Sequence, residues 1–252
     1  MAGHSHWSNI QHKKAIKDKK KGKVLSRLAK LIYTSVKEGG SGKPEENPRL
    51  RLILDKCRQA NMPKENVKRA IDRAIAPGGG YDPMTFEGYA QDGVAVVVEC
   101  LTDNTQRTGP EIRFIFDRNG AKVGKPGSVL HMFQRKAVFQ VEKEKATEER
   151  LMEAALEAGA DDVTEQDVFF EVTADPALFV AVGEGLAKAG LETSLAEIQM
   201  IPSNRIEVAL ETAEKISKLV DALEENEDVQ NVYTNFDVSA EAAAALDRGL
   251  KA

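Results

Sequence analysis

The run Pro77–Gly78–Gly79–Gly80 divides the chain into two parts with different residue patterns. A proline followed by three glycines does not continue a helix or a strand, because proline lacks an amide donor and glycine loses the most backbone entropy on ordering. Before this run the apolar residues recur at helical spacing, and after it β-branched runs alternate with helical patterns. The run is therefore the clearest predicted domain boundary.

The part before the boundary is predicted to form a helical bundle. Apolar residues recur three and four apart from Val24 to Val36, and the pair Gly39–Gly40 ends this pattern. Asn47 is placed to cap a second helix that has Pro48 in its first turn. A third helix is expected to begin at Pro63.

The part after the boundary is predicted to be α+β, in small two-layer domains. A helix is expected near 179–186, with Asp175 as its cap and Pro176 in its first turn. The other expected helices lie near 112–116, 151–156 and 216–223, and the expected strands lie near 94–98, 137–141, 168–172, 198–201 and 229–236.

Charge is distributed very unevenly along the chain. Residues 1–76 contain 19 Lys and Arg against 7 Asp and Glu, a net charge of +12. The remaining 176 residues contain 16 against 33, a net charge of −17. Such asymmetry indicates a polyanion-binding arm on an acidic body that a phosphate backbone would avoid.

The cations are densest in residues 13–30, where Asp18 is the single acid. If residues 9–21 are helical, five of these lysines fall within an arc of roughly 120° and form a cationic stripe. This pattern favours nucleic-acid binding through phosphates over a solvated face or a membrane-surface helix, which would need a facing apolar row. The predicted contacts are Lys13, Lys14, Lys17, Lys19, Lys20, Lys21, Lys23, Arg27 and Lys30.

Trp7 is the only tryptophan and lies close to His4, His6 and His12 in the sequence. Its ring is a candidate to stack on a base, as aromatic rings beside cations do on single-stranded targets. Packing of the ring as an apolar anchor on the helical bundle is an equal alternative. The histidines have no cysteine or carboxylate at zinc-ligand spacing, so no metal site is predicted.

The glycine-rich loop from Gly120 to Ser128 is a candidate secondary phosphate contact. Lys122 and Lys125 supply charge, and the glycines allow the backbone to approach an anion closely. Pro126 stands where a P-loop needs Ser or Thr for Mg²⁺, so this loop is not a nucleotide-binding P-loop. A plain mobile loop remains the alternative interpretation.

Nothing in the sequence predicts an enzyme. His131 has no nucleophile or acid at an instructive spacing, and no set of nucleophile, base and orienting group is recognisable. Neither a cofactor nor a small-molecule substrate is expected. Two distant cysteines, Cys57 and Cys100, indicate buried thiols in a reduced cytoplasmic protein. The longest apolar run is too short to span a bilayer, and the first residues lack a signal sequence, so no membrane association is predicted.

Several motifs, taken together, resemble one family. The opening Met1–Trp7 followed by Asn9–Ile10 is similar to the start of the YebC/PmpR family. His6 and Ala121 depart from the family's usual residues, a lysine or arginine and a second glycine, which puts the details of those two sites in doubt. The other matching stretches are Asn47–Arg51, Asn61–Pro63, Phe86–Tyr89, Glu99–Asn104, Arg107–Thr108, Gly127–Val129, Met152–Ala160 and Met200–Pro202.

The resemblance implies three domains and a role in gene expression. Residues 1–77 would form the basic helical domain, and residues 78–132 with 203–240 an α+β domain. Residues 133–202 would be an inserted ferredoxin-like α+β domain, and residues 241–252 a C-terminal tail. The family is described as DNA-binding transcriptional regulators. Its mitochondrial relatives resemble translational activators of cytochrome c oxidase subunit I, and bacterial members are linked to ribosomes stalled on proline-rich stretches.

The expected partner is therefore a nucleic acid, and the sequence leaves two choices open. One is DNA, with the chain acting as a transcriptional regulator. The other is RNA or the ribosome, with the chain acting as a translation factor. The helix expected from Pro63 carries Lys64, Asn66, Lys68, Arg69 and Arg73, which keeps a base-reading helix possible. The more basic N-terminal arm suits backbone contact without base readout.

Overall fold

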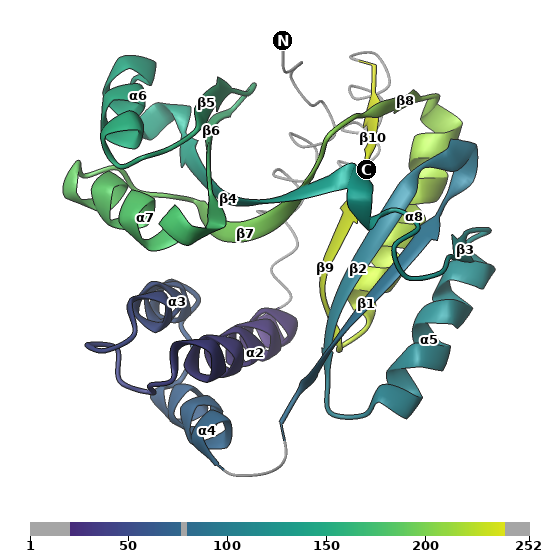
Figure 1. The fold of residues 1–252 in the computed structure, drawn as a ribbon, viewed down its shortest axis with the longest axis horizontal. Coiled ribbons are helices and arrows are strands. Elements are labelled where there is room, and N and C mark those ends of the chain that lie inside the picture. Colours follow the sequence, from purple (N-terminus) through teal and green to yellow (C-terminus); the bar gives the residue numbers. More distant parts are fainter. Residues whose placement is uncertain (1–20, 77–79, 240–252) are drawn as a thin grey trace. The chain divides into compact units, whose positions relative to one another are not determined.

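The computed structural model describes residues 21–76 and 80–239 (Figure 1). Contacts between residues divide them into two compact units. The helix–sheet unit comprises residues 21–128, without 77–79, and residues 215–232. The acidic unit comprises residues 129–214 and 233–239. The first unit has 21 Lys and Arg against 18 Asp and Glu, whereas the second has 7 against 19, so the acidic charge is concentrated in one unit.

Three helices open the helix–sheet unit: α2 (Lys21–Gly39), α3 (Pro48–Gln59) and α4 (Lys64–Ile75). Asn47 joins the first two, because its side chain accepts a hydrogen bond from the Leu50 amide at 3.0 Å and donates to the Ser35 carbonyl at 2.9 Å. The helices then enclose an apolar core that includes Ile32, Leu50, Cys57 and Ala74. The predicted helical bundle is confirmed.

A four-stranded sheet completes this unit, with the strand order β3-β1-β2-β9. Its central pair is antiparallel and joined by the short turn Ala90–Val94, in which Asp92 and Gly93 have positive φ. Strand β9 reaches the sheet from far along the chain. The strands are β1 (Asp82–Tyr89), β2 (Ala95–Thr102), β3 (Lys122–Val123) and β9 (Val229–Thr234).

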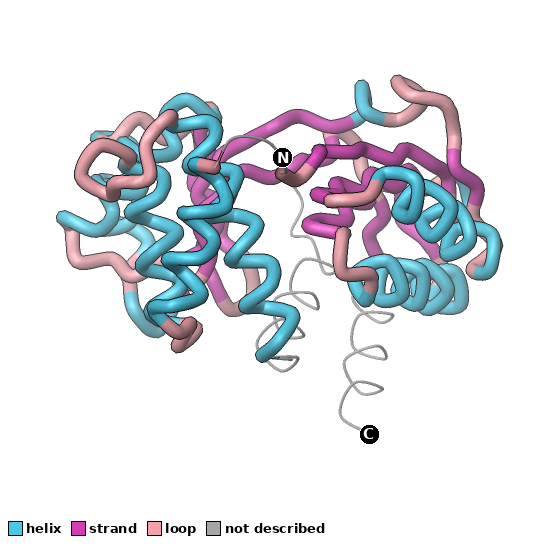
Figure 2. Tube along the Cα trace, turned by 90° about the horizontal axis from the view of Figure 1, so that it is seen from below, coloured by secondary structure: helices cyan, strands magenta, loops and turns pink. Residues whose placement is uncertain are grey.

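Helices α5 (Thr105–Arg118) and α8 (Leu210–Glu225) pack against this sheet. At the right of Figure 2 both helices lie on the same side of the strands. Ile112 and Phe116 of α5 are fully buried, so that face of the helix is the inner one. Gly88 in β1 is required by close packing, since a Cβ there would lie 2.6 Å from the Phe116 ring and 2.5 Å from the Lys122 carbonyl oxygen.

The acidic unit contains the second four-stranded sheet, with the antiparallel strand order β5-β6-β4-β7. Its elements follow one another as strand, helix, strand, strand, helix, strand, which is the ferredoxin-like arrangement. A short parallel pair joins β8 to β10. The elements are β4 (Phe133–Glu142), α6 (Glu148–Glu157), β5 (Asp162–Glu165), β6 (Phe169–Ala174), α7 (Phe179–Lys188), β7 (Leu195–Pro202), β8 (Ile206–Val208) and β10 (Phe236–Val238).

The structure confirms the predicted α+β class and the expected helices. Asp175 caps as predicted, accepting a hydrogen bond from the Ala177 amide at 2.8 Å, although a short 3-10 turn precedes α7. The sequence analysis did not predict β1, β3, β5, β8 or β10, and β3 lies in the stretch that it expected to be a glycine-rich loop. The domain limits proposed from the family resemblance remain a prediction. Short 3-10 turns occupy Gln91–Gly93, Leu130–Met132, Lys143–Lys145 and Pro176–Leu178.

Candidate nucleic-acid interface

The predicted cationic stripe runs into helix α2 from residues that lie outside the described part. Lys21 and Lys23 occupy the first turn of α2, where the structure describes the backbone alone. Arg27 and Lys30 are the members of the stripe whose side chains are described. Outside the described residues lie Trp7, Lys13, Lys14, Lys17, Lys19 and Lys20.

The sequence analysis predicted that Arg27 and Lys30 contact phosphates. In the structure their side chains instead make hydrogen bonds to the sheet. The Arg27 guanidinium is half-buried and donates to the side-chain oxygen of Asn231 on β9. Lys30 is only 5% exposed, so it cannot reach a phosphate, and its assignment as a contact was wrong. The two residues lie three apart on the helix face that packs on the sheet. Sequence spacing could not show this, because their partners are about 200 positions away.

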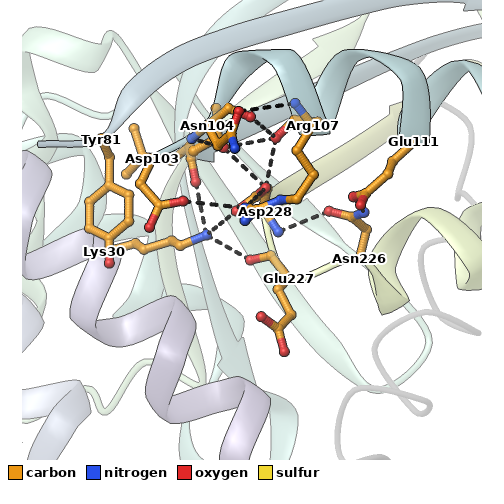
Figure 3. A network of polar contacts seen from close by, with 12 residues as sticks. Lys30, Tyr81, Asp103, Asn104, Arg107, Glu111, Asn226, Glu227 and Asp228 are labelled. Atoms are coloured by element: carbon orange, nitrogen blue, oxygen red, sulfur yellow. Dashed lines mark hydrogen bonds and ion pairs between the residues drawn. The ribbon is translucent and has the colours of Figure 1, made fainter.

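Lys30 instead forms a buried ion pair with Asp228 (Figure 3). Its ammonium group lies 3.2 Å from the Asp228 carboxylate and donates to the carbonyl oxygens of Leu101 at 2.8 Å and Glu227 at 2.7 Å. These three acceptors satisfy the three donors of a lysine. The contacts join α2 to the end of β2 and to the segment that leads into β9.

Three further donors complete the shell around Asp228, and one of them is the Thr102 hydroxyl, 3.1 Å from the carboxylate. The Arg107 guanidinium and the Thr108 hydroxyl, both from the first turns of α5, each lie 2.7 Å from the same carboxylate oxygen. Burial of Asp228 would raise its pKa, but the hydrogen bonds from Arg107, Thr108 and Lys30 outweigh burial and lower the pKa to about 2. The carboxylate therefore stays ionised and holds helix, strand and loop together.

Helix α4 reaches the same region through Arg73. Its guanidinium lies over the Tyr81 ring, 4.2 Å from the centroid, donates to the Tyr81 hydroxyl at 2.7 Å, and lies 3.7 Å from the Asp103 carboxylate. The Lys30 ammonium nitrogen also lies over the Tyr81 ring, 5.3 Å from its centroid. The Arg73 guanidinium is thus engaged in contacts within the protein. This leaves Lys64, Asn66, Lys68 and Arg69 of the five residues that the sequence analysis considered for contact with bases.

The remaining polar side chains of α4 divide into two groups. Arg69 donates to the Glu65 carbonyl and to the Asn66 side chain of its own helix. Lys64 and Lys68 lie four apart and are exposed. Neither of these lysines bonds to any residue that the structure describes. The cations that α4 offers to a ligand are therefore these two lysines, beside the exposed acids Glu65 and Asp72 of the same helix. Lysine suits phosphates better than base edges.

The glycine-rich loop is held in place by β1. The Gly124 amide donates to the Glu87 carbonyl at 2.7 Å, and the Gly127 amide donates to the Glu87 carboxylate at 2.6 Å. The Ser128 carbonyl accepts a hydrogen bond from the Tyr89 hydroxyl at 2.8 Å. Two of the amides that the predicted phosphate cradle would use are thus already bound, one of them to a buried carboxylate.

Lys122 and Lys125 nevertheless remain available as side chains. Both are exposed, and Lys122 lies on the edge strand β3 opposite Tyr89. The contact predicted for this loop therefore reduces to two lysine side chains, without the amide cradle.

The two cysteines are free and buried, as the sequence analysis predicted. Burial raises the pKa of Cys57 to about 11 and that of Cys100 to about 12, so both thiols stay protonated near neutral pH. No described helix is long and apolar enough to cross a membrane. Within residues 21–76 and 80–239, no three His, Cys, Asp or Glu side chains gather closely enough to hold a metal ion.

Comparison with known proteins identifies the family. Residues 5–76 match the N-terminal domain of the TACO1/YebC proteins, and residues 81–236 match their second and third domains. The chain belongs to the TACO1/YebC family. This family match confirms the resemblance found in the sequence. It also covers the Asp228 network, because Lys30 lies in the first matched region and Asp228 in the second.

Similar proteins carry a regulatory name. A "Probable transcriptional regulatory protein" of Rubrobacter xylanophilus is 47% identical over 98% of this chain and 99% of its own length. One of Mycobacterium tuberculosis is 45% identical, over 98% and 99%. The crystal structure of a conserved hypothetical protein from Aquifex aeolicus has a TM-score of 0.81 at 37% identity, covering 88% of this chain and 92% of that one. A regulatory role is thus supported by the names of these relatives.

Proposed function

We propose that this chain is a nucleic-acid-binding regulator of gene expression that holds the phosphate backbone through its basic N-terminal segment and helix α2. The observation that carries the proposal is the distribution of basic residues along the N-terminal segment and α2. Arg27 and Lys30 dock α2 on the sheet, and the sequence before them carries seven lysines between Lys13 and Lys23 against one acid, Asp18, which is the composition expected of a polyanion contact. Among the described residues, the excess of acidic charge belongs to the other unit, which has 7 Lys and Arg against 19 Asp and Glu.

The first ligand to consider is duplex DNA, because curated relatives are named transcriptional regulators. The lysine-rich composition of the arm and of α4 supports contact with phosphates and little reading of bases. We therefore expect binding with a modest preference for any one sequence, below the ~10³ ratio of specific over non-specific affinity that marks the lower end for operator-binding proteins.

Charge reversal in the arm tests the proposal. We expect the variant Lys13→Glu/Lys17→Glu/Lys20→Glu to lose affinity for DNA or RNA and to reduce the slope of log K against log salt by about 3 or more, since three phosphate contacts are removed and reversed. Titrations of a labelled duplex at several salt concentrations measure both quantities. An unchanged slope would contradict the proposal.

The matched control keeps the same change in net charge but moves it off the arm. Three exposed lysines elsewhere, Lys145, Lys188 and Lys218, are suitable for reversal in the full-length chain. This control should alter the slope little. Deleting residues 1–77 is a poorer test, because it also removes Lys30 and leaves the Asp228 carboxylate buried without its amine.

A second candidate function is binding to RNA or the ribosome in translation. The observation that favours it is a second cationic position, Lys122 and Lys125, on a loop fixed by its contacts with β1. Two separated positions suit a large, shaped RNA surface better than a single linear groove. Reversal of both lysines should then weaken co-sedimentation with ribosomes and leave short-duplex binding nearly intact. Equal loss for both ligands would mean that the loop adds general charge alone.

A further inference from the structure

Helix α5 presents an aromatic side chain to solvent. Ile112 and Phe116 are fully buried, whereas Phe114, between them in sequence, is 63% exposed. It is the most exposed large hydrophobic side chain in the described residues. A partner that covered this ring would gain the free energy of burying it.

Arginines flank this ring. Arg113 precedes Phe114, and Arg118 follows one turn later; both are exposed. Neither forms a hydrogen bond or an ion pair with any residue in 21–76 or 80–239. Arg107 lies two turns earlier on the same stripe, and its guanidinium is held by Asp228. At 100° per residue Arg107, Phe114 and Arg118 fall within roughly 40° of one another. Glu111 and Asp117 are the acids on this face, and the Glu111 carboxylate accepts a hydrogen bond from the Asn226 side chain at 2.9 Å.

A second exposed apolar helix face provides the contrast. On α6, Met152 is 38% exposed and Leu156 is 54% exposed, one turn apart. Their neighbours on the same surface are Glu149, Glu153 and Glu157. That face repels phosphate, and its aliphatic side chains offer no flat ring. The face of α5 combines a ring with cations, which is the combination that binds single-stranded nucleic acids by base stacking and phosphate contact.

We propose that the outer face of α5 is a stacking site for single-stranded nucleic acid, with a base on Phe114 and neighbouring phosphates on Arg113 and Arg118. This inference rests on the proposed function and names the ligand class that a second site of the protein takes. A duplex does not present an unstacked base, so it gains nothing from Phe114. The arm binds either form through phosphates.

Alanine substitution of the ring separates the two ligand forms. Binding is measured with full-length protein by fluorescence anisotropy, using a labelled oligouridine and a labelled DNA duplex, each about 12 nucleotides or base pairs long. Phe114→Ala should weaken oligouridine binding about tenfold and leave duplex binding within about twofold. Leu156→Ala, at the exposed residue of α6, is the control and should change neither. No loss for oligouridine, or an equal loss for both ligands, overturns the stacking site.

The flanking charges have a separate readout. Arg113→Gln/Arg118→Gln should reduce the salt slope for oligouridine by about 1.4, the value for two single-strand phosphate contacts. Asp117→Asn should strengthen binding, because it removes one of the two acids on this face. An unchanged slope overturns the assignment of the arginines.

A spectroscopic variant distinguishes stacking from a structural effect. Phe114→Trp places an indole on this face, and its emission should be quenched by oligouridine more strongly than that of the wild-type chain. Sedimentation of Phe114→Ala without nucleic acid completes the test. If this substitution dissociates an oligomer, the ring serves a protein interface and the proposal fails. If the wild-type chain binds neither oligouridine nor duplex, the proposed function itself fails, which is a different result from loss of the Phe114 effect alone.

Discussion

The two units of the molecule use charged side chains in different ways. In the helix–sheet unit, Lys30, Glu87 and Asp228 are buried, and each makes hydrogen bonds that join separate elements. The buried polar residues of the acidic unit, Gln140, Gln166 and Asn235, are uncharged, and its ion pairs, such as Lys136 with Asp161, lie at the surface. Glu171, a half-buried acid of this unit, forms no ion pair with any described residue, and burial raises its pKa. The first unit therefore depends on specific polar geometry, whereas the second is held by its apolar core.

The core of the acidic unit shows what this second kind of stability needs. Phe139 and Phe169 are fully buried, and the Phe139 ring stacks on Phe179 with centroids 5.3 Å apart. Apolar packing of this kind depends little on pH or salt. In contrast, a buried ion pair gives little net stability over an apolar replacement but is costly to break, since one charge then remains without a partner.

Breaking the buried pair is the largest effect expected. Lys30→Met keeps much of the side-chain volume but leaves the Asp228 carboxylate without its ammonium group. We expect a loss of about 3–5 kcal/mol in the free energy of unfolding. Urea unfolding followed by circular dichroism measures the loss, and hydrogen exchange at the Leu101 amide, which donates to the Asp228 carbonyl, locates it. A loss below about 1 kcal/mol would show that the pair is no more than a surface ion pair.

The pH dependence of the free energy of unfolding tests the same difference between the two units. The pKa of Asp228 is about 2 in the folded chain, against about 3.9 in an unfolded one, so its ionised form favours folding. This contribution, about 2.5 kcal/mol, is complete above pH ~5 and is lost as the pH falls through ~2. Asp228→Asn lacks this titration. Its stability should therefore vary less steeply with pH in that window than the stability of the wild-type chain, and identical slopes would contradict the role of the carboxylate.

The smallest effect is expected at the surface of the acidic unit. Lys136→Met removes the ammonium group that lies 2.7 Å from the Asp161 carboxylate, in a pair whose side chains are 31% and 43% exposed. Water and salt screen such a pair, so the free energy of unfolding should change by less than about 0.5 kcal/mol. Urea unfolding measured alongside Lys30→Met gives the comparison directly. A larger loss here would erase the distinction between the two units.

Local signals were predicted well from the sequence. Asn47 before Pro48 identified the start of α3, and the β-branched run Val94–Val98 identified β2, because both depend on neighbouring residues. Strand β1 (Asp82–Tyr89) was not predicted, since Pro83, Glu87 and Gly88 weaken its strand pattern. Its place in the sheet comes from pairing with β2 and from Gly88 admitting the Phe116 ring.

The candidate site was predicted in part. Charge counts pointed to the N-terminal segment, but they could not distinguish a lysine that faces solvent from one that neutralises a buried acid. Lys30 was therefore assigned to the wrong role. Phe114 was placed in a predicted helix, yet the sequence offered no sign of its exposure, because apolar residues occupy both faces of that stretch. Both points depend on contacts between distant parts of the chain.

The late return of β9 to the sheet has a consequence for synthesis. Lys30 precedes Asp228 by 198 residues. At about 5–20 residues per second, a ribosome takes roughly 10–40 s to add that length. During this interval α2 has already emerged, while β2 lacks its neighbour β9 and Lys30 lacks its carboxylate. The nascent chain thus carries an unpaired sheet edge until residues 229–234 are made, and the helix–sheet unit closes only after the 198 residues that follow Lys30 have been added.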